Sequence, residues 1–337
     1  MEEEAPDLIP QEIVFLILKL SDTSTVHKCK LVCKSWLFFA MEILQSRIYP
    51  RLVTIIGTEG QSDQLRFPGG LAYDSHQELL YVSDTFNNRI QAFYVASRRT
   101  GKQEDGLNWP PLEISWHGQE MCRSPETTVV DREGRVLVLE SSNSGNKINI
   151  LRQGHFIESR NLTCMALDPK EETFFVLGVN DRVSAYEYNS GTPMRKTLSW
   201  GSSGSGTTDL NRPQGLAIDK ASGWIYIADT ENHRVQVFMP EGVFLFQWGL
   251  KGVWGGRFQF PTDISIDEEG HVFVADSQNH RVQVFDRKGN VLCAWGKEGS
   301  AGKCFKCPRR LCVAVIDGNR YLFVSDRENH RVQVFQY

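Results

Sequence analysis

Carboxylate, amide, imidazole and guanidinium side chains recur in this chain in a fixed order, and such groups can bind a metal or transfer a proton. One copy runs from Asp229 through Asn-His to Arg234, and further copies begin at Asp276 and Asp326. A degraded copy begins at Asp84, with Asn-Asn-Arg in place of Asn-His-Arg. One active site does not need several copies of its groups. We therefore expect a structural network, within or between units, in which Asp229 accepts hydrogen bonds from Arg234 or its neighbour.

Three cysteines near the C-terminus have a spacing that suggests a metal site. Cys304 and Cys307 are separated by two residues, and Cys312 follows. A closed zinc site needs four ligands, and no fourth Cys or His lies close in the sequence. We therefore interpret the three as core cysteines rather than zinc ligands, and we expect no metal and no cofactor.

Each of the four aspartates ends an apolar segment, so the repeated unit is a strand, a short turn and another strand. The last three aspartates lie roughly 50 residues apart, and the gap before them leaves room for about three more units. Within one unit we expect an inner strand at Gly215–Asp219, a second at Trp224–Asp229, a third at Arg234–Met239 and an outer strand at Val243–Gly249. Six such units are typical of a β-propeller.

The ends of the repeat region indicate how the ring closes. Leu52–Gly57 has the pattern of an outer strand without a unit of its own, and the last unit stops at Tyr337, in its third strand. We expect the first strand to complete the last blade, which removes both sheet edges. The six expected inner strands are Gly70–Asp74, Thr127–Asp131, Thr163–Asp168, Gly215–Asp219, Asp263–Asp267 and Leu311–Val315.

These repeats resemble the NHL family, which is named for an Asn-His-Leu phrase. The resemblance spans Leu52 to Tyr337, and the phrase reads Asn-His-Arg in three units. It weakens in the second and third units, where Gly145-Asn146-Lys147 and Asn180-Asp181-Arg182 stand instead, so the boundaries of those blades stay open. A propeller of this kind is usually a binding platform.

Residues 1–50 lack this rhythm and carry a helical pattern. Ile13, Ile17 and Leu20 recur at the spacing of one helix face. A segment of this size buries too little surface to be robust alone, which points to a partner surface. The expected fold is therefore a small α-helical module over 1–50, followed over 51–337 by an all-β six-bladed propeller closed by an N-terminal outer strand.

The N-terminal segment resembles an F-box between Asp7 and Leu44. Its Leu-Ile-Pro-Gln-Glu-Ile opening and its Val-Cys-Lys-Ser-Trp phrase match that family, with Ile9 before Pro10 as the departure. The resemblance implies docking onto a Skp-family adaptor and, through it, onto a cullin–RING ubiquitin ligase. It divides eight residues between that contact and the small core of the module: Leu8, Pro10, Ile13, Ile17, Leu18, Leu31, Val32 and Trp36.

The two resemblances together imply the substrate-recognition subunit of an SCF-type (Skp–cullin–F-box) ubiquitin ligase. The chain itself would not be an enzyme and would position a protein client. We expect the client on the top face of the propeller, where clustered arginines favour an acidic or phosphorylated peptide. The expected contacts are Arg66, Arg212, Gln214, Trp254, Arg257, Thr262 and Arg309, with Arg310 as a further outer contributor.

Three alternatives remain for the propeller: RNA binding, a scaffold without ubiquitination, and a metal-dependent hydrolase or lyase. The expected inner strands contain no His, which disfavours the enzyme. The net charge of −4 gives no basic footprint, so RNA is possible but not favoured.

Composition also bears on location. The start Met1-Glu2-Glu3-Glu4 is unlike a signal peptide, and the apolar run Ile13–Leu18 is too short to span a bilayer. We expect no membrane contact, free thiols for the eight scattered cysteines, and a cytoplasmic or nuclear location.

Overall fold

The computed structural model describes residues 50–57, 64–95, 111–113, 122–141, 147–150, 156–158, 162–168, 170, 173–178, 180–188 and 195–337. The chain divides between Tyr49 and Pro50, and the described residues belong to the unit Pro50–Tyr337. These residues form six four-stranded sheets, arranged as the blades of a propeller. In the described segments no helix is long and apolar enough to cross a membrane.

Each blade is an antiparallel meander that runs outward from its inner strand. Blade 1 comprises β2 (Pro68–Asp74), β3 (Leu79–Asp84), β4 (Arg89–Tyr94) and β5 (Pro111–Glu113). Blade 2 comprises β6 (Pro125–Val130), β7 (Val136–Glu140), β8 (Lys147–Ile150) and β9 (Phe156–Glu158), and blade 3 comprises β10 (Leu162–Leu167), β11 (Thr173–Gly178), β12 (Arg182–Glu187) and β13 (Lys196–Trp200).

The remaining blades carry the well-preserved repeats. Blade 4 comprises β16 (Gly215–Ile218), β17 (Ile225–Asp229), β18 (Arg234–Phe238) and β19 (Phe244–Trp248), and blade 5 comprises β20 (Pro261–Ile266), β21 (Val272–Asp276), β22 (Arg281–Phe285) and β23 (Val291–Trp295). Blade 6 comprises β24 (Pro308–Ile316), β25 (Asn319–Asp326), β26 (Arg331–Gln336) and the N-terminal β1 (Arg51–Ile56). A short parallel pair, β14 (Ser202–Ser203) and β15 (Asp209–Leu210), lies before blade 4.

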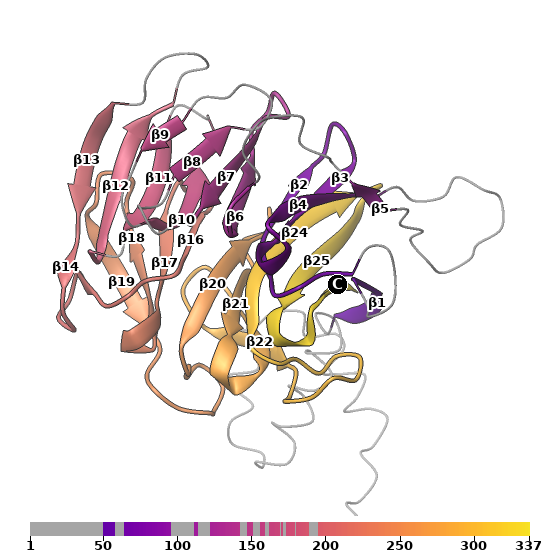
Figure 1. The fold of residues 1–337 in the computed structure, drawn as a ribbon. Helices are drawn as coiled ribbons and strands as arrows, with labels where there is room; N and C mark the ends of the chain where they lie inside the picture. Colours follow the sequence, from indigo (N-terminus) through magenta and orange to yellow (C-terminus); the bar gives the residue numbers. More distant parts are fainter. Residues whose placement is uncertain are drawn as a thin grey trace, which may run out of the picture. The chain divides into compact units, whose positions relative to one another are not determined.

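The N-terminal strand closes the ring. β1 pairs antiparallel with β26, from Arg51 opposite Gln336 to Ile56 opposite Val332. Figure 1 shows the indigo β1 beside the yellow strands of the last blade. The predicted closure is thus confirmed, and the third strand of the last blade is not left as an unpaired edge.

The predicted fold class, a helical module followed by the propeller, is wrong. The described residues are all-β, and their helical segments are four three-residue 3₁₀ turns. The F-box prediction falls on residues 1–49, which lie outside the described residues. The physical weakness of the prediction is that spacing over so short a segment shows an apolar face but supplies no packing partner, and isolated short helices are marginal in water.

The core lies between successive blades. In one cluster Tyr226 and Val237 of blade 4 pack with Ile264 and Val274 of blade 5. A tryptophan ends the outer strands of blades 3, 4 and 5. That of blade 4 joins this packing: the ring centroids of Trp248 and Phe285 lie 5.6 Å apart, across neighbouring blades.

The glycine after the tryptophan is required for close approach. Gly249 has a φ of +101°, and a Cβ there would lie 2.6 Å from the ring of Phe258. Gly296, the equivalent residue in the next unit, has a φ of +110° and a Cβ there would lie equally close to Phe305. The Trp-Gly pair therefore ends the outer strand and turns the chain toward the next blade.

Candidate binding face

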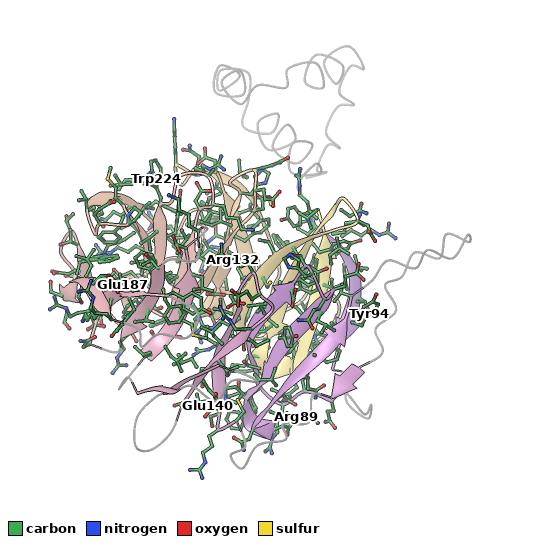
Figure 2. The ribbon with its side chains drawn as sticks, turned by 90° about the horizontal axis from the view of Figure 1, so that it is seen from above. Arg89, Tyr94, Arg132, Glu140, Glu187 and Trp224 are labelled. Atoms are coloured by element: carbon green, nitrogen blue, oxygen red, sulfur yellow. The ribbon has the colours of Figure 1, made fainter. Side chains whose placement is uncertain are left out.

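The top face is the end of the propeller where the inner strands begin and the second strands end. It carries the loops that enter each blade and the turns η2 (Thr85–Asn87), η3 (Thr230–Asn232), η4 (Ser277–Asn279) and η5 (Arg327–Asn329). In Figure 2, Arg89 and Glu140 lie at this end and Trp224 lies at the other.

A buried carboxylate organises each well-preserved blade from within. Asp229 is fully buried and accepts hydrogen bonds from Nε of Arg234 at 2.7 Å and Nδ2 of Asn232 at 2.9 Å. It also accepts from the backbone N–H of Asn211 at 2.7 Å and from Nε2 of Gln236 at 3.2 Å. The predicted bond between Asp229 and Arg234 is confirmed. Asp84, Asp276 and Asp326 accept the same four kinds of donor.

The arginine of the phrase fixes the backbone of the loop above it. Nη1 of Arg281 donates to the carbonyl of Val253 at 2.7 Å, and Nη2 donates to those of Trp254 and Arg257 at 3.0 and 2.9 Å. Gln283 donates to the same Arg257 carbonyl at 2.7 Å. Arg234 and Arg331 hold the equivalent loops of the neighbouring blades in the same way. These loops are therefore held in one conformation before any partner binds.

The histidine of the phrase links blades 4, 5 and 6 each to the next blade in the ring. The backbone N–H of Phe260 donates to Nδ1 of His233 at 3.1 Å, and Cys307 and Phe67 donate likewise to His280 and His330. In the degraded copies the acceptor is the side chain of Asn88, bonded to Ser124, or of Asp181, bonded to Arg212. The five acceptor residues all have positive φ, from 53° to 58°. Because His, Asn and Asp tolerate this conformation and offer an acceptor, they can replace one another here.

Arg310 closes the central channel at its top end. The guanidinium donates to the carbonyls of Gln214 and Thr163 at 2.6 and 2.8 Å and to Oγ1 of Thr127 at 3.1 Å. It also forms an ion pair with Asp263 at 3.3 Å, and 4% of the Arg310 side chain is exposed. One residue of blade 6 thus contacts blades 2, 3, 4 and 5. The prediction that Arg310 contributes to the outer surface is wrong.

Below this closure the channel contains a cavity of about 520 Å³, lined by the inner strands of all six blades. Asp263 and Arg310 lie in its lining at the closed end, and Asp74, Asp131 and Lys220 lie farther down. Burial raises the pKa of the Asp263 carboxyl, and the neighbouring Arg310 opposes that effect. The lining is mixed in character, and its closed end is occupied by an ion pair that is already formed.

Two groups of exposed side chains stand on the top face. Trp254 is 76% exposed, and Leu250 and Val253 of the same loop are 65% and 60% exposed. On blade 1, Phe86 is half exposed and the guanidinium of Arg66 lies 6.0 Å from its ring. Aromatic and arginine side chains of this kind are enriched among the residues that dominate protein interfaces.

The pattern of the NHL repeat matches residues 210–238 and 258–285. The two segments contain the inner three strands of blades 4 and 5, with the Asp-centred networks and interblade histidines described above. This propeller contains NHL repeats. The resemblance is thereby confirmed for these two segments, which form part of blades 4 and 5 of the six-bladed ring.

Two curated relatives match short stretches of this NHL propeller. The E3 ubiquitin-protein ligase TRIM71 of Rattus norvegicus is 51% identical over 47 residues, which are 14% of this chain and 5% of that protein. Protein brain tumor of Drosophila melanogaster is 37% identical over 57 residues, which are 17% of this chain and 5% of that protein. This chain therefore spans only a small part of the length of these relatives.

Solved structures with the same architecture are more distant in sequence. A gluconolactonase from Xanthomonas campestris superposes with a TM-score of 0.55 at 12% identity, over 85% of this chain and 98% of that one. A chain of a nidogen–laminin complex gives a TM-score of 0.50 at 18% identity, over 69% of this chain and 81% of that one. At these identities the likeness shows the fold alone.

The sequence-predicted contact residues of the NHL propeller divide by accessibility. Arg66, Arg212, Trp254 and Arg257 are exposed. Thr262 is 4% exposed, and its hydroxyl donates to the carbonyls of Pro308 and Arg309, so it cannot serve as a contact. Gln214 is half-buried and supplies its carbonyl to Arg310. Sequence reasoning missed Phe86, Leu250, Val253 and Arg327, although Phe86 and Arg327 stand in turns that the repeat spacing had located.

The remaining predicted sites give no structural result. Leu8, Pro10, Ile13, Ile17, Leu18, Leu31, Val32 and Trp36 lie outside the described residues. Cys304 is buried, and Cys307 and Cys312 are half-buried. Within the described ranges no group of three or more His, Cys, Asp or Glu residues could hold a metal ion.

The histidine link predicts acid sensitivity of the NHL propeller. Burial, and then the nearby Lys251, lower the pKa of His233 below its ordinary value of 6.5. Because the unfolded chain then binds this proton more readily, the contribution of His233 to stability is present above about pH 6.5 and is lost as the pH falls below that value. We expect His233→Asn to fold, since Asn88 fills the same position in blade 1. Its melting temperature should fall less than that of the wild type between pH 7.5 and 5; an equal fall would contradict the role assigned to His233.

Proposed function

We propose that this chain is the substrate-recognition subunit of an SCF-type ubiquitin ligase. In this proposal the top face of the NHL propeller binds a protein client, and the N-terminal segment docks onto a Skp-family adaptor and so onto a cullin–RING ligase. The chain is a non-catalytic receptor. It raises the local concentration of the client and orients it toward the ubiquitin-charged conjugating enzyme.

The loop that carries Trp254 is the observation that supports client binding most strongly. Its backbone is held by Arg281 and by Asn279, whose side chain donates to the Gly252 carbonyl at 2.9 Å. Large apolar side chains on such a loop remain in water without a partner, and exposed apolar patches of this kind mark interaction sites. A rigid loop also loses little conformational entropy on binding, which favours affinity.

The ubiquitin-ligase part of the proposal rests on sequence. The segment between Asp7 and Leu44 matches the F-box pattern at its Leu-Ile-Pro opening and at its Val-Cys-Lys-Ser-Trp phrase. A short stretch of the chain matches TRIM71, a protein that is named an E3 ubiquitin-protein ligase. This match supports a role of the propeller in ubiquitination.

Co-purification of the full chain with a Skp-family adaptor and a cullin tests this assignment. We expect the wild type to form a stoichiometric complex and the Leu8→Ala/Pro10→Ala variant to lose it. Trp254→Ala is the matched control, since an exposed side chain on the top face should leave adaptor binding and the melting temperature unchanged. An adaptor that binds neither wild type nor variants, or binds all of them equally, would refute the ligase assignment.

A further inference from the structure

Two arginines on the top face share one carboxylate without bonding to it. Nη2 of Arg309, near the start of β24, lies 3.9 Å from Oε2 of Glu126. Nη1 of Arg327, in η5, lies 3.8 Å from the same oxygen. Both separations allow electrostatic attraction but exceed the length of a hydrogen bond. Glu126 therefore balances part of the charge and satisfies neither donor.

One donor nitrogen of each of these two arginines has no hydrogen-bond partner among the described residues. Nε of Arg309 and Nη1 of Arg327 are buried atoms without a hydrogen-bond partner among the described residues. Buried donors are paired in the great majority of cases, and an unpaired one is costly. Arg310 directly below cannot accept their hydrogen bonds, because a guanidinium only donates, and its own Nε is likewise buried without a partner.

The local charge also calls for an anion. Arg309, Arg310 and Arg327 are three cations, opposed by the two carboxylates of Glu126 and Asp263. Burial, and then Arg310 and Arg327, lower the pKa of Arg309 to about 10, which still leaves it charged at neutral pH. One further negative charge would balance the cluster.

The cluster is recessed but reachable. The side chains of Arg309, Arg327 and Glu126 are 27%, 20% and 25% exposed, and the channel beneath is closed by Arg310. A ligand must therefore enter from the top face with a small terminal group. The exposed aliphatic side chains of Leu250 and Val253 stand on the same face, and aliphatic contacts suit a polypeptide better than the bases and phosphates of RNA.

We propose that the recess formed by Arg309 and Arg327 binds an oxyanion, the carboxylate or phosphate of a side chain in the client polypeptide. This inference deepens the proposed function and rests on it. The anion accepts hydrogen bonds from both guanidiniums, which turn to present their buried donors, and it displaces Glu126 as their counter-ion. The other exposed groups of the face then contact the flanking residues of the client.

Binding of inorganic phosphate to the full chain tests the recess without a known client. We expect phosphate, compared with chloride at equal ionic strength, to raise the melting temperature of the wild type saturably. Arg309→Gln and Arg327→Gln should each weaken that response at least tenfold in apparent affinity. Arg195→Gln, which changes an exposed arginine in the turn between β12 and β13, is the matched control and should respond like the wild type.

A third variant keeps the test decisive if the arginine variants fold poorly. Glu126→Gln removes the competing carboxylate and should bind phosphate several-fold more tightly than the wild type. An equal response in wild type, Glu126→Gln and the arginine variants, or no response in any of them, would overturn the proposal. Adaptor co-purification is independent of these residues, so failure here is distinguishable from failure of the ligase assignment.

Labelled ligands distinguish the sources of the anion. Fluorescein-labelled peptides of one Leu-rich sequence, with a central phosphoserine, glutamate or serine, are titrated against the full chain beside a labelled oligouridylate. We expect the phosphoserine or glutamate peptide to bind, the serine peptide to bind at least tenfold more weakly, and Arg309→Gln to remove the difference. Binding of the oligouridylate alone, lost in Arg309→Gln, would replace the peptide by RNA.

Discussion

Asp229→Ala is expected to destabilise the propeller by about 3–5 kcal/mol, because it removes the partner of a buried guanidinium. Arg234 would keep its bonds to loop carbonyls but lose its counter-ion, and the donors of Asn211, Asn232 and Gln236 would lose their shared acceptor. Urea unfolding followed by tryptophan fluorescence measures the change. The loop before blade 4 should also become more accessible to hydrogen exchange.

The control for this prediction is Glu241→Ala, which changes an exposed acidic residue in a turn of the same blade. We expect that substitution to shift stability by less than about 0.5 kcal/mol. If the two variants unfold at the same urea concentration, the Asp-centred network does not stabilise the blade.

Arg310→Met is expected to be about as severe, again about 3–5 kcal/mol, because it leaves the carboxylate of Asp263 buried without a cation. The carbonyls of Thr163 and Gln214 would also lose their donor. Arg309→Met is the matched control: the neighbouring arginine has contact with Glu126 at ion-pair distance only, so its loss should cost about 1 kcal/mol or less. Equal losses in both variants would show that the channel closure adds nothing special.

The stability of Arg310→Met should depend on pH, because the variant leaves the Asp263 carboxyl buried without its cation. Burial already raises the pKa of Asp263, and loss of the arginine removes the effect that opposes it. An acid whose pKa is higher in the folded state is destabilising once the pH rises above its unfolded value. The difference in the free energy of unfolding between Arg310→Met and wild type should therefore shrink as the pH is lowered toward 4. At pH 7, adding Asp263→Asn to the Arg310→Met chain should recover part of the lost stability.

The strands and the ring could be predicted because four of the blades repeat the same alternation and end their second strand with Asp84, Asp229, Asp276 or Asp326. The role of the phrase followed from its repetition alone. The interblade role of His233 was harder to predict. It depends on two residues with positive φ, because His233 accepts a hydrogen bond from the backbone N–H of Phe260 in the next blade. Asn88 and Asp181 at the same position were the signal that could have revealed it.

The difference between Arg309 and Arg310 could not be predicted from their adjacent positions. A register shift between Pro308 and Leu311 changes which side chains face the channel, and such a bulge leaves little trace in the sequence. Thr262 was misplaced for a related reason, because the equivalent shift lies between Pro261 and Asp263. The helical pattern at the N-terminus falls on residues 1–49, which lie outside the described residues.

Affinity purification of three full-length chains tests most directly whether the top face selects the client. The recovered proteins are quantified by mass spectrometry, and their ubiquitination is measured. The chains are the wild type, Leu8→Ala/Pro10→Ala and Trp254→Ala/Arg309→Gln. We predict that the first variant loses the Skp-family adaptor but keeps the clients, and that the second keeps the adaptor but loses clients and their ubiquitination. Recovery and ubiquitination of the same proteins by the wild type and the top-face variant would contradict the claim that this face selects the client.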